Sequence, residues 1–152
     1  MTATSTDCIR KEIHLRASRT RVWKALSDAR EFGTWFGMRL EGDFAPGRAI
    51  QGQITNPGFD HIRLEVVVER MEAEQLFAYR WHPYPMDVNR DYSKEAMTLV
   101  EFRLETVQDG TLLTVVESGF DQLPPDRRDE AFRMNEGGWA SQLKRIDRHV
   151  AN

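Results

Sequence analysis

Residues 132–150 read FRMNEGGWASQLKRIDRHV, and this stretch decides the fold of the chain. Its apolar residues, at intervals of seven, four, three and four, are Phe132, Trp139, Leu143, Ile146 and Val150. That spacing puts them on one face of an α-helix. A helix with one apolar stripe must bury it against a second layer, so the rest of the chain has to supply an apolar surface.

Two adjacent glycines, Gly137 and Gly138, lie within this predicted helix. Each costs about 1 kcal/mol relative to alanine in a helix interior. A glycine pair in mid-helix usually marks a bend or a close approach of the backbone to other groups. If the helix approaches the sheet or a ligand closely at Gly138, a Cβ atom will not fit there. If Gly138 faces solvent instead, alanine would be the more stable residue there.

The apolar surface that the helix needs is predicted upstream, where apolar residues alternate along short segments. The predicted strands are Cys8–Leu15, Arg39–Phe44, Arg48–Thr55, His61–Met71, Leu76–His82, Thr98–Thr106 and Thr111–Ser118. Short turns such as Ala45-Pro46-Gly47 and Asp109-Gly110 separate the strands from Arg39 onward, which favours an antiparallel meander. The longest connection, residues 84–97, is expected to be mobile or to fold over the mouth of a cavity.

Two short helices are predicted directly after the first strand, with Ser18 and Asp28 as their N-caps. Gly33 and Gly37 limit the length of the second helix. The fold class is therefore α+β: a curved antiparallel sheet of six or seven strands wrapped around a long C-terminal helix. We expect a single domain over residues 8–151 and a disordered tail over residues 1–7.

The bulk composition limits the classes of function. The 152 residues carry a net charge of −3, so no overall basic field favours a nucleic-acid partner. The single cysteine, Cys8, excludes an internal disulfide. No segment approaches the ~20 apolar residues of a membrane span, and residues 1–7 lack the pattern of a secretory signal. A cytoplasmic protein, monomeric or homodimeric, is the expectation.

Several motifs, in this order, resemble those of a known superfamily. They are residues 17–28 (ASRTRVWKALSD), Trp35-Phe36-Gly37, residues 110–114 (GTLLT), residues 117–120 (ESGF) and Gly138-Trp139. Together with the element order they resemble the START-like, or SRPBCC, superfamily, and most closely its branch homologous to the activator of the heat-shock protein 90 ATPase. The resemblance implies a helix-grip fold with a ligand cavity. It does not specify a reaction, since the superfamily includes carriers, receptors, cyclases, hydrolases and co-chaperone domains.

Catalytic and metal motifs are not found in the sequence. There is no Gly-x-Ser-x-Gly nucleophile motif and no Gly-x-Gly-x-x-Gly dinucleotide motif. The histidines His14, His61, His82 and His149 are scattered, without the spacing of a zinc site. We therefore expect no cofactor and no metal, and the sequence names no catalytic residue.

Aromatic residues from almost every element supply the candidate binding site. Pockets for small molecules are mostly apolar with a few polar groups, and a curved sheet around one helix is hard to fill completely. The candidate ligand-binding residues are Trp35, Phe36, Phe44, Tyr79, Trp81, Phe102, Glu117, Met134, Gly138 and Trp139. Taken singly, each aromatic residue is better explained as part of a packed core. Tyr79 and the tryptophans are expected to orient a ligand through their polar atoms.

Glu117 is the most informative single candidate. Strand alternation puts it on the inward face, where a carboxylate must be paired, hydrogen-bonded or neutralised. A salt bridge to Arg80 or Arg103 is one explanation, but both arginines alternate away from that face. We therefore favour an inward carboxyl without a charged partner.

The primary hypothesis is a protein that binds a small apolar, aromatic or lipid-like ligand in an internal cavity. A protein-interaction or co-chaperone-like module remains as one alternative, and a cyclase- or hydrolase-type enzyme that uses the cavity as another.

Overall fold

One antiparallel sheet of seven strands forms the scaffold, in the order β1-β7-β6-β5-β4-β3-β2. The structure is a computed structural model that describes residues 7–151. The strands are β1 (Cys8–Leu15), β2 (Met38–Leu40), β3 (Ala49–Ile54), β4 (Arg63–Glu72), β5 (Leu76–Trp81), β6 (Thr98–Val107) and β7 (Gly110–Ser118). The predicted tail lies outside the described residues except for Asp7, whose carbonyl oxygen accepts hydrogen bonds from Gly119 and Phe120.

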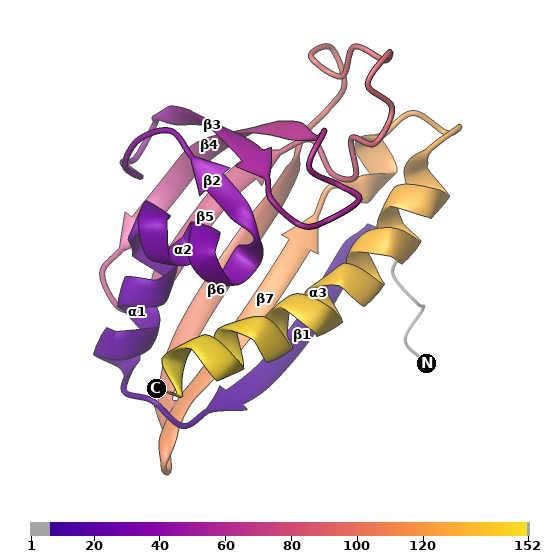
Figure 1. Ribbon diagram of the computed structural model, residues 1–152. Coiled ribbons are helices and arrows are strands. Elements are labelled where there is room, and N and C mark those ends of the chain that lie inside the picture. Colours follow the sequence, from indigo (N-terminus) through magenta and orange to yellow (C-terminus); the bar gives the residue numbers. More distant parts are fainter. Residues whose placement is uncertain (1–6, 152) are drawn as a thin grey trace, which may run out of the picture.

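The three α-helices of the described residues lie on one face of this sheet (Figure 1). They are α1 (Arg19–Ser27), α2 (Ala29–Phe36) and α3 (Arg128–Val150), and a short 3₁₀ turn, η1 (Phe120–Gln122), precedes α3. α3 crosses the sheet diagonally, and α1 and α2 cover the part of the face that α3 leaves open. The predicted α+β helix-grip architecture is confirmed. Within residues 7–151, no helix is long and apolar enough to cross a membrane.

The two short helices begin where their capping residues predicted. The Ser18 hydroxyl accepts a hydrogen bond from the Arg21 backbone nitrogen at 3.1 Å. The Asp28 carboxylate accepts from the backbone nitrogens of Arg30 and Glu31. These bonds satisfy backbone donors that the first turn of a helix leaves free. α2 ends at Gly37, whose φ of 91° suits glycine.

The strand predicted over Arg39–Phe44 is shorter than expected. β2 ends at Leu40, because the following segment leaves the sheet so that Phe44 can pack into the core. The Phe44 ring lies 4.9 Å from the Phe77 ring and 5.6 Å from the Phe32 ring, measured between centroids. Core burial of one aromatic residue therefore outweighs continued pairing at the edge of the sheet.

The apolar stripe of α3 is buried as predicted, but the glycine pair does not behave as expected. Trp139, Leu143, Ile146 and Val150 are buried in one continuous helix. Gly138 is exposed, and a Cβ built there would meet nothing within 4 Å, so of the two alternatives the solvent-facing one holds and the close approach to the sheet is excluded. The reason is rotational: Gly138 is about 100° around the helix from its buried neighbour Trp139.

The close approach occurs in α2 instead. A Cβ on Gly33 would overlap the carbonyl oxygen of Met38, which is backbone and cannot rotate away. Here the helix packs directly against β2, the edge strand that follows it.

These two glycines make a matched pair for a stability measurement. Gly33→Ala should lower the free energy of unfolding by about 1–3 kcal/mol, because the added methyl group overpacks the contact with Met38. Gly138→Ala should raise it by up to about 1 kcal/mol through helix propensity. Urea unfolding midpoints of the two variants measure both effects. A lower midpoint for Gly138→Ala would contradict the open environment found at that position.

Candidate ligand-binding site

Glu117 lies at the centre of the candidate site. It is completely buried on β7, on the same inward face as Leu113 and Val115, as strand alternation predicted. Because a buried carboxylate without partners is very costly, the surrounding side chains must explain why it is there.

Four donors surround the Glu117 carboxylate. Oε2 accepts from Trp81 Nε1 at 2.7 Å and from Thr98 Oγ1 at 2.5 Å. Oε1 accepts from Trp139 Nε1 at 2.8 Å and from Asn135 Nδ2 at 2.9 Å. A carboxylate has about four lone-pair sites, so this set of donors occupies all of them.

None of the four donors carries a charge. Arg80 pairs with Glu69 and Arg103 with Glu101, so the salt bridges considered from sequence are wrong. Within residues 7–151, Glu117 forms no ion pair. The prediction of an inward carboxyl without a charged partner was right about charge, although the group is saturated with hydrogen bonds rather than free.

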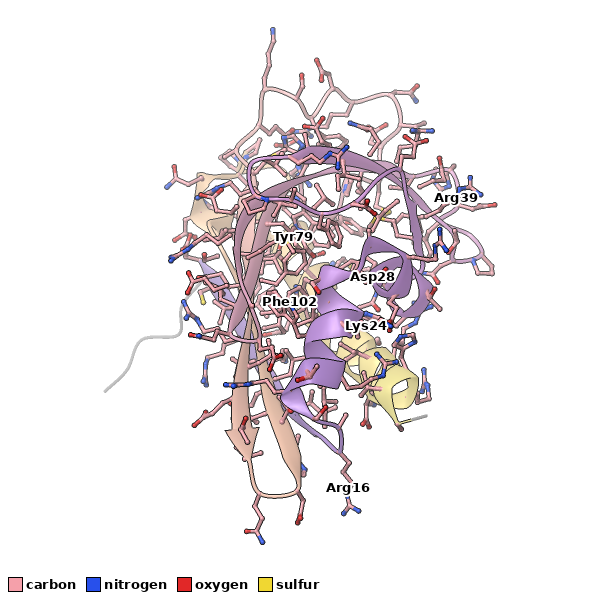
Figure 2. The ribbon with its side chains drawn as sticks, turned by 90° about the vertical axis from the view of Figure 1, so that its left-hand side faces the viewer. Arg16, Lys24, Asp28, Arg39, Tyr79 and Phe102 are labelled. Carbon is pink, nitrogen blue, oxygen red and sulfur yellow. The ribbon has the colours of Figure 1, made fainter. Side chains whose placement is uncertain are left out.

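Tyr79 lies on β5 beside this centre and is also fully buried (Figure 2). Burial, and secondarily the negative charge of Glu117, raise the pKa of the Tyr79 phenol well above its ordinary range. Its hydroxyl has no hydrogen-bond partner among the described residues. The ring packs 5.1 Å from Trp81 and 6.2 Å from Phe32, so Tyr79 belongs to the core.

Phe32, which the sequence analysis left out of the site, fills the interior. Its ring contacts six other rings at centroid distances of 4.8–6.3 Å: those of Trp35, Phe36, Phe44, Phe77, Tyr79 and Phe102. In Figure 2, Tyr79 and Phe102 lie in this layer between the sheet and the helices. Trp35, Phe44 and Phe102 are therefore core residues, and Trp35 Nε1 donates to the carbonyl oxygen of Ala25.

Two partly open clefts lie beside α3, next to the Glu117 centre. The helix cleft has a volume of about 140 Å³ and is lined by Phe36, Trp81, Asn135, Gly138, Trp139 and Gln142. The loop cleft has a volume of about 130 Å³ and is lined by Phe36, Ile54, Ile62, Leu64, Trp81, His82, Tyr84, Pro85, Met86 and Asn135. Phe36, Trp81 and Asn135 belong to both, so the two clefts adjoin.

A larger surface hollow of about 520 Å³ lies between α2 and β2. Its lining includes the exposed charged residues Arg30, Arg39 and Asp43. Ligand pockets are mostly apolar with few polar groups, so the smaller aromatic clefts are the better candidates.

The structure brings together only part of the predicted residue set. Phe36, Trp81, Gly138 and Trp139 line the helix cleft, and Glu117 lies behind the two indoles. Met134 points away: it is 42% exposed and lines neither cleft.

Three polar residues of the site were missed. Asn135 and Gln142 lie four residues before and three after Trp139, which is the spacing of one helix face. Thr98 shares strand parity with Val100 and Phe102, so its inward position was also readable. All three were passed over because the sequence analysis searched for aromatic residues.

The long loop at residues 82–97 is fastened to the start of α3. Arg127 pairs with Glu95 at 2.6 Å, and both side chains are 8% exposed. Arg90 bridges Glu95 and Asp126 at 2.8 Å each. The Tyr92 ring lies 4.7 Å from the Arg127 guanidinium. The loop therefore has a fixed position, in which its first residues form one wall of the loop cleft.

Histidines contribute no metal site within the described part of the chain, where no group of three or more potential ligands occurs. His82 Nε2 lies 3.1 Å from the carbonyl oxygen of Glu95, which ties it to the loop.

One protein-family model matches this chain, and many solved structures share its fold. The family model described as Activator of Hsp90 ATPase homolog 1-like protein matches residues 16–151. No curated protein matches the chain.

Three solved structures illustrate the similarity of fold. Protein MLL2253 from Mesorhizobium loti is 20% identical, with 95% of this chain and 96% of that chain covered and a TM-score of 0.75. The Aha1 dimer from Colwellia psychrerythraea is 18% identical, with 94% and 95% covered and a TM-score of 0.71. DynU16, described as a putative protein in the dynemicin biosynthetic locus, is 21% identical, with 96% and 48% covered and a TM-score of 0.74.

Replacing Glu117 tests whether its hydrogen bonds hold the site together. In Glu117→Gln the amide nitrogen would face two of the four donors and leave them buried without an acceptor. The free energy of unfolding should fall by about 2–6 kcal/mol. Glu105→Gln, an exposed position on β6, should change it by no more than about 0.5 kcal/mol. Equal urea midpoints for the two variants would show that the Glu117 bonds contribute little.

Proposed function

The chain belongs to the family of Activator of Hsp90 ATPase homolog 1-like proteins, and on that basis we propose that it binds a small ligand in the clefts beside α3. The ligand has an apolar or aromatic body. The observation that carries the proposal is the pair of adjoining clefts, which share the aromatic residues Phe36 and Trp81. Apolar walls with a few oriented polar groups are the usual composition of small-molecule sites.

The size of the clefts limits the ligand. Pockets for drug-sized molecules measure about 300–1,000 Å³. Volumes of about 140 and 130 Å³ suit a small molecule, or a ligand with one part in each cleft. A whole lipid would need a larger interior, and Phe32 occupies the space that such a cavity would take.

Binding is better supported than catalysis. A general base needs a free lone pair within reach of the substrate. The lone pairs of Glu117 are all engaged by protein donors, so its carboxylate is better suited to orienting the indoles than to proton transfer. In the loop cleft, the cyclase- or hydrolase-type alternative would depend on His82, whose Nε2 lies 3.1 Å from the carbonyl oxygen of Glu95 and is therefore already engaged.

A protein-interaction role has less support. The exposed large apolar residues of the described chain are Phe59, Val88 and Met134, which come from three separate segments. Interaction surfaces usually present a contiguous apolar patch of several hundred Å². The relative from Colwellia psychrerythraea is described as a dimer, so sedimentation velocity is the direct measurement for self-association of this chain.

A fragment screen with a matched pair of variants tests the proposed site. Gly138 lines the helix cleft and has open space around it, so phenylalanine there should cover the cleft without disturbing the core. Its neighbour Gly137 is equally open and lines neither cleft. Fragments that bind should stabilise the protein by about 2.7 kcal/mol at 100 times Kd. Gly138→Phe should abolish this stabilisation, whereas Gly137→Phe should retain it.

Nuclear magnetic resonance of the indole N–H groups localises the binding. The signals of Trp81 and Trp139 should shift when a fragment that binds is titrated in. The signal of Trp35, whose indole donates a hydrogen bond to the carbonyl oxygen of Ala25, should not shift. If no fragment moves the first two signals, or if Gly138→Phe binds as the parent does, the proposed site is wrong.

A further inference from the structure

Most of the side-chain donors around the helix cleft are already used by the protein. The indole nitrogens of Trp81 and Trp139 and the amide nitrogen of Asn135 all donate to Glu117. The amide nitrogen of Gln142 donates to the carbonyl oxygen of Phe36 at 3.0 Å. The protein thus engages both indole N–H groups and one N–H of each amide, which leaves one N–H of Asn135 and one of Gln142.

Acceptors, in contrast, remain available. Glu117 and the Phe36 carbonyl only accept, so each amide must present its nitrogen to them and its oxygen elsewhere. Gln142 Oε1 is buried and has no hydrogen-bond partner among the described residues. The Asn135 oxygen is the end of its amide turned away from Glu117. A ligand that donates N–H or O–H groups therefore matches these amide oxygens, whereas a carboxylate or phosphate would have only the second N–H of each amide as a donor.

The Glu117 carboxylate, which lies behind the rings of Trp81 and Trp139, also favours a positively charged ligand. Glu117 has no charged partner within residues 7–151, and its field reaches Tyr79, where it contributes to the raised pKa. Both cleft indoles donate to this carboxylate, and donation to an anion polarises the donor group. Electron-rich tryptophan rings are the strongest side-chain partners for cations.

One cation opposes this preference. Arg145 lies three residues after Gln142, and its guanidinium donates to the Phe36 carbonyl at 3.1 Å and to Asn56 Oδ1 at 3.1 Å. Arg145 does not line the cleft, and its guanidinium is held by the Phe36 carbonyl at the end of α2. A positive ligand group is therefore best placed at the tryptophan end of the cleft.

From these observations we infer that the helix cleft selects a positively charged nitrogen, either a protonated amine or a quaternary ammonium, on an apolar or aromatic body. This inference rests on the proposed function, since it names the ligand class of the same site. The geometry that supports it is a wall of aromatic rings and acceptor oxygens in front of a buried carboxylate without a counter-charge.

Three small probes of similar shape and different charge test the inference. Choline carries the ammonium, neohexanol is its uncharged carbon analogue, and pivalate carries a negative charge on a similar branched body. Titrations followed at the Trp139 indole N–H should give choline at least about tenfold tighter binding than neohexanol, equivalent to about 1.4 kcal/mol. Pivalate should be the weakest of the three.

Charge substitutions at the cleft should change the ratio of choline affinity to neohexanol affinity. Gln142→Glu puts a carboxylate beside both the cleft and Arg145 and should raise the ratio about fivefold, whereas Gln142→Lys should lower it by a similar factor. Ser141→Glu adds the same charge at an exposed neighbouring position outside the cleft and should leave the ratio within about twofold.

The outcomes separate this inference from the proposed function. If neohexanol or pivalate binds at the Trp139 signal as tightly as choline does, the preference for a cation is wrong and the proposed binding site stands. The inference is also overturned if the ratio of choline affinity to neohexanol affinity is the same in Gln142→Glu, Gln142→Lys and the parent protein. If no probe and no fragment binds at the clefts, both proposals fail together.

Discussion

The four hydrogen bonds to the buried carboxylate of Glu117 are the constraint on which the rest of the structure depends. They join β5 through Trp81, β6 through Thr98, and α3 through Asn135 and Trp139, all to a residue of β7. A charge removed from water must keep every one of these partners, because each lost bond leaves a buried polar group unsatisfied. The position and rotation of α3 above the sheet are thus set by polar geometry as well as by its apolar stripe.

This arrangement determines what the neighbouring clefts can offer a ligand. By using the indole and amide donors internally, the carboxylate leaves ring surfaces and amide oxygens on the cleft walls. The aromatic packing around Phe32 also limits where a ligand can bind. It fills the interior, so the aromatic clefts lie at the margin of α3. A site at the rim of a packed core also agrees with its small volume.

Much of the fold could be predicted from local patterns. The caps at Ser18 and Asp28, the stripe from Trp139 to Val150 and the alternation along β7 all correspond to what the structure shows. Predictions failed where long-range packing decided, as at Phe44, which leaves the sheet to enter the core, and at Gly138, whose surroundings depend on the rotation of α3. For the candidate clefts, Phe36, Trp81 and Trp139 were among the predicted residues, whereas Trp35, Phe44 and Phe102 belong to the core. Asn135, Gln142 and Thr98 follow the helix spacing and strand parity of predicted residues, but only the packing of α3 on the sheet brings their polar atoms to Glu117 and the cleft.

The sequence by itself determined most of the secondary structure, the antiparallel meander from β2 to β7, the family resemblance and the inward direction of Glu117, but not the pairing of β1 with β7. These properties depend on periodicity, capping and strand parity, which act over a few residues. Only the tertiary structure decided that the interior is filled by Phe32 and its neighbours, that Glu117 bonds to four uncharged donors, and that two aromatic clefts lie beside α3. Those features arise from side chains far apart in the chain, such as Phe32 and Phe102 or Trp81 and Glu117, whose distances are set only when sheet and helix pack together.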